Sequence, residues 1–133
     1  MRVSQRLRRG ALVGLMGAAA LPVFALPWTN FAPMRDTPIT RFSPADTKLM
    51  TETVYRTLSS GEDGVAASWS NPATSSGGTV TPAKDPKGRA GCRLAQVENH
   101  FRSMRGEGAY IFCKSDGKTK GAPPWKLVSP WPA

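Results

Sequence analysis

The 133-residue sequence predicts an α+β fold, in which one N-terminal amphipathic helix packs on a small antiparallel sheet of four to five strands. One helical pattern follows Ser43, and short alternating segments separated by turns run from residue 64 to residue 128. Two cysteines lie at the start and at the end of a predicted hairpin within these segments. A helix followed by hairpin-linked strands is typical of an α+β domain. The length fits a single domain, which commonly has roughly 100–150 residues.

The first 25 residues have the composition of a signal peptide. Four arginines among the first nine residues precede about 16 uncharged residues that end at Ala25. A basic start, an apolar run and a small residue at the cut are features of a secretory signal. We expect cleavage after Ala25, with Ala20 as the second candidate; the alternative, a membrane anchor, needs roughly 20 apolar residues. No cysteine lies near either site, so we expect a periplasmic or outer-membrane-associated protein that is not a lipoprotein.

Cleavage changes the charge of the protein. Residues 26–133 carry 14 basic and 9 acidic side chains, a net charge of +5. This suits contact with lipopolysaccharide, peptidoglycan or another envelope protein, but it is not the dense basic stripe of a nucleic-acid-binding protein. After cleavage we expect no transmembrane segment. One histidine and two cysteines are too few for a zinc site, and we expect no metal or cofactor.

Residues 26–42 contain three prolines and several aromatic residues. Because proline lacks an amide donor and restricts the residue before it, they predict a non-helical lead-in. Its aromatic residues either dock on the domain or belong to a free tail. The domain itself is expected over residues 43–133 and begins with a helix: Ser43 can cap it, Pro44 fits the first position and Asp46 adds negative charge to the first turn.

This helix is expected to continue to Ser60 and to end at Gly61. Its apolar residues recur at helical spacing and predict a stripe that covers a sheet: they are Leu49, Met50, Val54 and Leu58. Charged residues lie four apart on the opposite face and can pair along it: they are Lys48, Glu52 and Arg56.

The rest of the sequence predicts short strands separated by turns. Alternating residues, bounded by Asn, Gly and Pro, are typical of strands joined by tight connections. The strands are expected at residues 65–70, 79–81, 92–101, 107–114 and 125–128. Turns or loops are expected at residues 73–78, 83–91, 102–106 and 115–124.

The two cysteines are expected to form a disulfide. Cys92 opens one predicted strand and Cys113 closes the next, so an antiparallel hairpin brings them side by side. An exported protein reaches an oxidising compartment in which such a bond persists. Closing a loop of this size contributes roughly 3 kcal/mol to stability. The alternative, a redox-active pair, is typical of a Cys-x-x-Cys spacing, which the sequence lacks.

Few residues indicate catalysis. His100, the only histidine, is expected on the solvent face of a strand, although a hydrolase could be built on it with nearby carboxylates. The acidic residues are scattered, so a carboxylate pair for glycoside hydrolysis is neither indicated nor excluded. Basic residues gather in the strand-end loops, either as a binding patch or as a solvated surface: they are Lys84, Lys87, Arg89, Arg93, Arg102, Arg105, Lys114, Lys118 and Lys120.

Several short motifs occur in a familiar order. Trp69-Ser70-Asn71-Pro72 precedes residues 78–82 (GTVTP), Gly91-Cys92-Arg93 follows, and Cys113-Lys114 leads to Asp116-Gly117 and Trp125. In this order the sequence resembles the C-terminal domain of the 17 kDa surface antigen family of Gram-negative bacteria. The resemblance covers residues 43–128 and implies an envelope protein with a small α+β domain, no recognised catalytic residues and no cofactor.

The sequence departs from that family in two respects. The family carries a lipid-modified cysteine and a glycine-zipper segment ahead of this domain, and this sequence shows neither. This favours a periplasmic or secreted form. The Asp-Gly-x-Trp turn of the family is also expanded here to residues 116–125, so a role of that turn does not carry over.

Together these features predict an exported, non-enzymatic envelope protein with a structural or binding role. The alternative is a small secreted binder or inhibitor of an envelope or host hydrolase, with the exposed turn at residues 114–124 inserted into a cleft. If there is a contact face, its candidate residues are Trp69, Arg93, Tyr110 and Trp125. Each of the four is equally expected to pack in the core, because large aromatic side chains dominate core burial.

Overall fold

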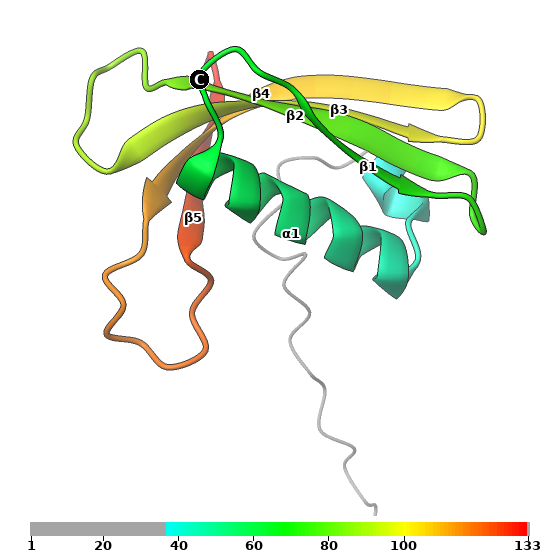
Figure 1. The fold of residues 1–133 in the computed structure, drawn as a ribbon, viewed down its shortest axis with the longest axis horizontal. Coiled ribbons are helices and arrows are strands. Elements are labelled where there is room, and N and C mark those ends of the chain that lie inside the picture. Colours follow the sequence, from blue (N-terminus) through cyan, green and yellow to red (C-terminus); the bar gives the residue numbers. More distant parts are fainter. Residues whose placement is uncertain (1–36, 133) are drawn as a thin grey trace, which may run out of the picture.

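A computed structural model describes residues 37–132. It contains a short 3-10 helix η2 (Pro38–Arg41), helix α1 (Pro44–Ser60) and strands β1 (Ala67–Asn71), β2 (Ser76–Lys84), β3 (Cys92–Phe101), β4 (Met104–Lys114) and β5 (Trp125–Trp131). The strands form one antiparallel sheet in the order β1-β2-β3-β4-β5, and α1 lies against one of its faces (Figure 1). The predicted α+β fold is therefore confirmed. The predicted signal peptide (residues 1–25) and the lead-in before residue 37 lie outside the described residues.

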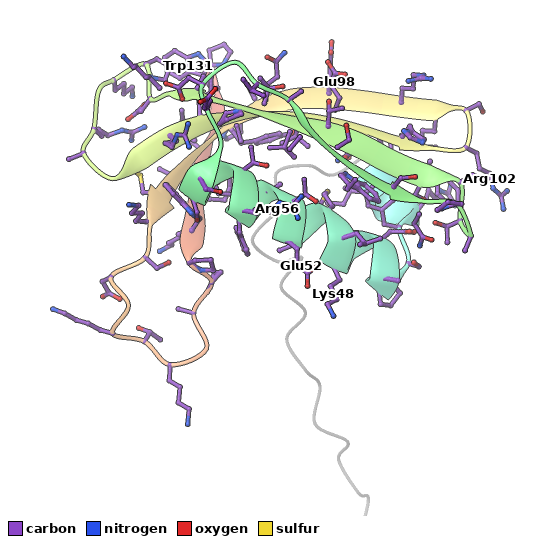
Figure 2. The ribbon with its side chains drawn as sticks, in the orientation of Figure 1. Lys48, Glu52, Arg56, Glu98, Arg102 and Trp131 are labelled. Atoms are coloured by element: carbon purple, nitrogen blue, oxygen red, sulfur yellow. A yellow bond between two sulfur atoms is a disulfide. The ribbon has the colours of Figure 1, made fainter. Side chains whose placement is uncertain are left out.

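Helix α1 begins as its sequence predicts. The Ser43 hydroxyl accepts a hydrogen bond from the Asp46 backbone N–H (3.2 Å), and the Ser43 N–H donates to the Asp46 carboxylate (2.8 Å). This reciprocal pair is a capping box, which satisfies two amide groups at the helix start. Met50, Val54 and Leu58 are buried against the sheet, whereas Leu49 from the predicted stripe is 36% exposed. Figure 2 shows Lys48, Glu52 and Arg56 on the side of α1 that points away from the sheet.

Strand β2 is longer than the sequence predicts. It was expected at residues 79–81 but runs from Ser76 to Lys84, through two glycines and Pro82. Pro82 faces Ala95 of β3, and its carbonyl accepts a bond from Gly64 N–H (2.8 Å) on the other side. The proline nitrogen points to that same side, at a position that lies beyond the first residue of β1. Its missing N–H therefore removes no hydrogen bond of the β1–β2 ladder. Proline is thus tolerated inside this strand.

The last two strands also exceed their predicted ranges. Strand β4 begins at Met104 because Arg102 and Ser103 alone form the turn, with Arg102 at a φ of 53°. Strand β5 extends to Trp131 through Pro130. It pairs with β4 on one side and is an edge strand, where proline is allowed.

The predicted disulfide is confirmed. Cys92 and Cys113 are direct partners in the β3–β4 register, with their Cα atoms 4.0 Å apart. The bond closes the end of this hairpin that lies opposite the Arg102–Ser103 turn.

The hydrophobic core lies between α1 and the sheet. It is formed by Met50, Val54, Leu58, Trp69, Val80, Ala95, Val97, Tyr110, Phe112 and Trp125. Phe42, from the predicted lead-in, packs edge-on against Trp69 with ring centroids 5.1 Å apart. This part of the lead-in docks on the domain, and residues 38–41 form a helical turn where the sequence predicted non-helical chain. Pro38 sits at the start of that turn, where its fixed φ is already suitable.

Candidate functional site

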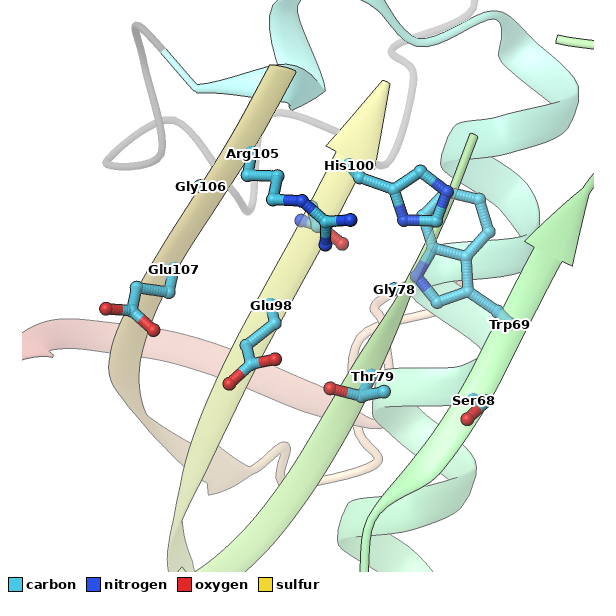
Figure 3. A pocket seen from close by; sticks show the side chains of 10 residues that line it. Ser68, Trp69, Gly78, Thr79, Glu98, His100, Arg105, Gly106 and Glu107 are labelled. Atoms are coloured by element: carbon cyan, nitrogen blue, oxygen red, sulfur yellow. The ribbon is translucent and has the colours of Figure 1, made fainter. Parts of the chain in front are cut away.

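The face of the sheet opposite α1 forms an open groove of about 610 Å³. Side chains alternate along β3, so that Ala95 and Val97 face the helix while Gln96 and Glu98 face outward. Figure 2 shows Glu98 on the side of the sheet away from α1. The groove is lined by Ser68, Trp69, Gly78, Thr79, Glu98, Asn99, His100, Arg105, Gly106 and Glu107 (Figure 3). We call this surface the outer groove.

Strand register arranges the outward side chains in two rows. The first row crosses four strands and consists of Ser68, Thr79, Glu98 and Glu107, each directly opposite the next. The second row consists of Ser70, Gly77, His100 and Arg105. Directly opposed residues in a sheet have Cβ atoms only about 4.5–5.5 Å apart. A ligand in the groove can therefore contact hydroxyl, carboxylate, imidazole and guanidinium groups together.

The first row places two carboxylates side by side. Glu98 of β3 and Glu107 of β4 are direct register partners, and both are exposed. Within residues 37–132, neither forms a salt bridge, although three such bridges occur elsewhere. Like charges directly opposite each other destabilise a sheet. The outer groove thus keeps an electrostatic cost that a bound cationic or hydrogen-bond-donating group would relieve.

Two consecutive glycines form the floor beside the second row. A Cβ on Gly77 would lie 2.7 Å from Cε1 of His100, on the outer face. A Cβ on Gly78 would lie 2.9 Å from Nε1 of Trp69 and 2.6 Å from Oδ1 of Asn99, on the helix face. Glycine is therefore required at both positions, because the imidazole and the indole cover the β2 backbone from opposite sides.

The four candidate contact residues do not form an exposed face. Trp69, Tyr110 and Trp125 belong to the core and retain only 5%, 7% and 3% of their exposure. Burial raises the pKa of the Tyr110 hydroxyl. The Trp125 indole N–H donates to the Ser59 hydroxyl of α1 (2.9 Å). The structure places these three aromatic residues in the core, which is the alternative that the sequence left open.

Arg93 serves the end of the helix. Its guanidinium donates to the backbone oxygens of Thr57 (3.3 Å), Leu58 (2.7 Å) and Gly61 (2.9 Å). It also pairs with the Asp63 carboxylate at 2.6 Å. The last carbonyls of a helix lack partners within the helix and carry partial negative charge. Arg93 therefore stabilises the C-terminal end of α1 from strand β3.

Two aspartates have structural roles as well. Asp46 is fully buried and accepts hydrogen bonds from Asn71 Nδ2 (2.6 Å) and the Thr74 hydroxyl (2.7 Å), joining α1 to the β1–β2 turn. Burial alone would raise the pKa of Asp46, but these bonds and those from Ser43 outweigh it and hold the pKa below 3.8. The Arg89 side chain lowers the pKa of Asp85 to about 2 and holds the β2–β3 loop in shape.

The sequence indicates some residues of the outer groove but not the groove itself. His100 does line the outer face of β3, and Glu98 precedes it by two positions. Ser68, Thr79 and Glu107 had no distinguishing pattern. Their assembly depends on the register of four strands, which the sequence pattern does not specify.

Residues 37–132 contain no group of three or more His, Cys, Asp or Glu side chains that could hold a metal ion. None of the helices described is long and apolar enough to cross a membrane. No protein-family model, curated protein or solved structure matches the chain.

Proposed function

We propose that the protein is an exported, non-enzymatic envelope protein that works by surface contact, with the outer groove as its contact surface. The observation that carries this proposal is the uncovered polar face, on which Glu98 and Glu107 stand opposed without a salt bridge inside residues 37–132. Real proteins break local rules of this kind mainly at functional sites, which supports a binding role for the pair. The disulfide supports export, because disulfides persist mainly in oxidising compartments.

The chemistry of the groove favours peptidoglycan among the expected envelope polymers. Carboxylates accept hydrogen bonds from amino and hydroxyl groups, and Arg105 can pair with a carboxylate. Peptidoglycan offers all three groups on its sugars and peptide stems. The open shape of the groove suits an extended polymer, which contacts a row of side chains across several strands.

Binding to purified peptidoglycan sacculi tests the proposal. The double variant Glu98→Gln/Glu107→Gln should bind about tenfold more weakly, because charge-assisted hydrogen bonds are worth roughly twice neutral ones. The control, Glu52→Gln/Glu62→Gln, removes the same charge from exposed residues of the helix side. Equal binding by both variants and the wild type would count against the outer groove. Release of soluble fragments that His100→Ala abolishes would instead identify a hydrolase.

A second function, inhibition of an envelope or host hydrolase, is favoured by the loop between β4 and β5. Residues 115–124 project from the end of the sheet (orange in Figure 1). The base of this loop is fixed by Ser115, whose N–H donates to the Pro124 oxygen (2.9 Å), and by the neighbouring disulfide. A preorganised protruding loop loses little entropy on entering a cleft. A panel of muramidases and proteases, assayed with and without the protein, tests this function.

A further inference from the structure

A second surface lies at the end of the sheet where β2, β4 and helix α1 finish. Two loops meet there, residues 85–91 between β2 and β3 and residues 115–124 between β4 and β5. The Lys114 N–H donates to the Gly91 oxygen (2.8 Å), and the Cys92–Cys113 disulfide joins the same strand ends. Both loops lie at the left of Figure 1. They therefore present their side chains at one end of the molecule.

This end carries most of the positive excess of residues 37–132. The two loops and the strand residues beside them, 84–91 and 113–126, contain seven basic and two acidic side chains. The other residues of 37–132, among them Glu62, Asp63 and Arg93 near this end, contain six of each, so their net charge is zero. We call the seven the basic end: Lys84, Lys87, Arg89, Lys114, Lys118, Lys120 and Lys126. All seven are exposed.

Most of these charges are not neutralised within residues 37–132. Arg89 pairs with Asp85 at 2.7 Å, and the Lys114 ammonium lies 5.8 Å from the centroid of the Trp125 ring. The other five lysines form no salt bridge with residues 37–132. Among the nearby acids, Asp63 is paired with Arg93, and Asp116 accepts a bond from the Lys118 backbone N–H (2.9 Å). Glu62 follows α1 at this end as well.

We propose that the basic end docks on a membrane surface whose lipids carry anionic phosphate groups. The charges are spread over two neighbouring loops, so an extended polyanionic surface can contact several of them at once, whereas a single phosphate can contact only one or two. The longer loop adds exposed Ala122 and Pro124 between Lys120 and Lys126. Lysines beside apolar residues suit the membrane interface, where anionic lipids attract basic side chains. Docking in this way leaves the outer groove free.

Vesicle sedimentation tests this proposal on the purified protein with its disulfide formed. Vesicles of phosphatidylglycerol in phosphatidylcholine should bind it, pure phosphatidylcholine should not, and added salt should weaken binding because it screens the charges. Each lysine near an anionic surface changes affinity about fivefold. The variant Lys118→Gln/Lys120→Gln should therefore bind about 25-fold more weakly. The control Lys48→Gln/Arg56→Gln, with the same change of charge on α1, should stay within about twofold of wild type.

Four results would overturn membrane docking by the basic end. Equal loss of vesicle binding in both double variants would mean that the net charge of the protein, and not the basic end, determines binding. Equal binding to phosphatidylcholine would exclude recognition of anionic lipid, as would no binding to either vesicle. Full competition by inorganic phosphate would mean that the basic end binds single phosphate groups. Each of these results leaves the peptidoglycan test untouched, because the lysine variants do not alter the outer groove.

Discussion

The imidazole of His100 and the indole of Trp69 cover opposite faces of strand β2, over the neighbouring glycines Gly77 and Gly78. His100 belongs to the outer groove and Trp69 to the core. The two glycines therefore connect the candidate site to the packing of the domain. Substitutions at Gly77 and Gly78 are therefore expected to change the stability of the protein by different amounts.

Alanine at Gly78 should destabilise the protein more than alanine at Gly77. At Gly78 the new methyl group would meet the buried Asn99 and Trp69 side chains at 2.6 and 2.9 Å, and overpacking of this kind costs about 1–3 kcal/mol. At Gly78 the methyl group would also clash with the Glu98 backbone oxygen. At Gly77 the partly exposed imidazole of His100 can move aside, which leaves a milder contact with the Trp69 backbone oxygen at 2.9 Å. Urea unfolding of both variants measures the difference. A smaller loss for Gly78→Ala than for Gly77→Ala would contradict this packing.

Loss of the Arg93 side chain should destabilise the domain by about 2–3 kcal/mol, because hydrogen bonds to charged groups are worth about 1.5–3 kcal/mol and three carbonyls lose a bond from the guanidinium. The Thr57 carbonyl keeps its bond from the Gly61 N–H. The variant Arg93→Ala, compared with Asp63→Asn in urea unfolding, separates the helix cap from the ion pair. The exposed Asp63 should matter much less. If both substitutions cost the same, Arg93 acts through its ion pair and not through the helix end.

Stability should fall in acid because of Asp46. Its pKa is below 3.8 in the folded protein, so the folded state binds its proton less readily than the unfolded state does. Its contribution is therefore complete above pH 3.8 and is lost as the pH falls through the lower folded value. Urea midpoints across the acid range should decline less steeply for Asp46→Asn than for wild type. Asp85→Asn, which removes the carboxyl with a pKa of about 2, isolates the second acidic contribution.

Reduction of the disulfide should lower the free energy of unfolding by about 3 kcal/mol, since the bond closes a chain segment with a separation of 21 residues. Denaturant midpoints with and without dithiothreitol measure this loss. The variant Cys92→Ser/Cys113→Ser should have the stability of the reduced protein and should not respond to dithiothreitol. A response in that variant would mean that the reductant acts elsewhere.

The sequence predicts the helix and the β3–β4 hairpin well because their signals are local. Ser43, Pro44 and Asp46 are adjacent in the chain and together determine where α1 begins. Likewise, Cys92 and Cys113 mark the ends of two consecutive strands. The first half of β2 was missed because Gly77 and Gly78 usually indicate a turn. Here the Trp69 and His100 side chains from the neighbouring strands fill the space beside these glycines.

The site residues were harder to predict because they depend on contacts distant in the chain. Arg93 looks like an exposed basic residue in the sequence, and only the folded arrangement brings it to Thr57, 36 positions earlier. Glu98 and Glu107 become neighbours through the register of β3 and β4. A shift of one residue in that register would move one of the two side chains to the opposite face of the sheet. Composition could indicate a basic protein, but not that its excess charge lies at one end.

The most direct test of the central claim measures stability and binding on the same variant, Glu98→Gln/Glu107→Gln. If the opposed carboxylates are kept for binding, their removal should raise the free energy of unfolding by about 0.2–1 kcal/mol, because repulsion is relieved. The same variant should bind peptidoglycan sacculi about tenfold more weakly. A variant that is no more stable and binds as tightly as wild type would contradict the assignment of the outer groove as the contact surface.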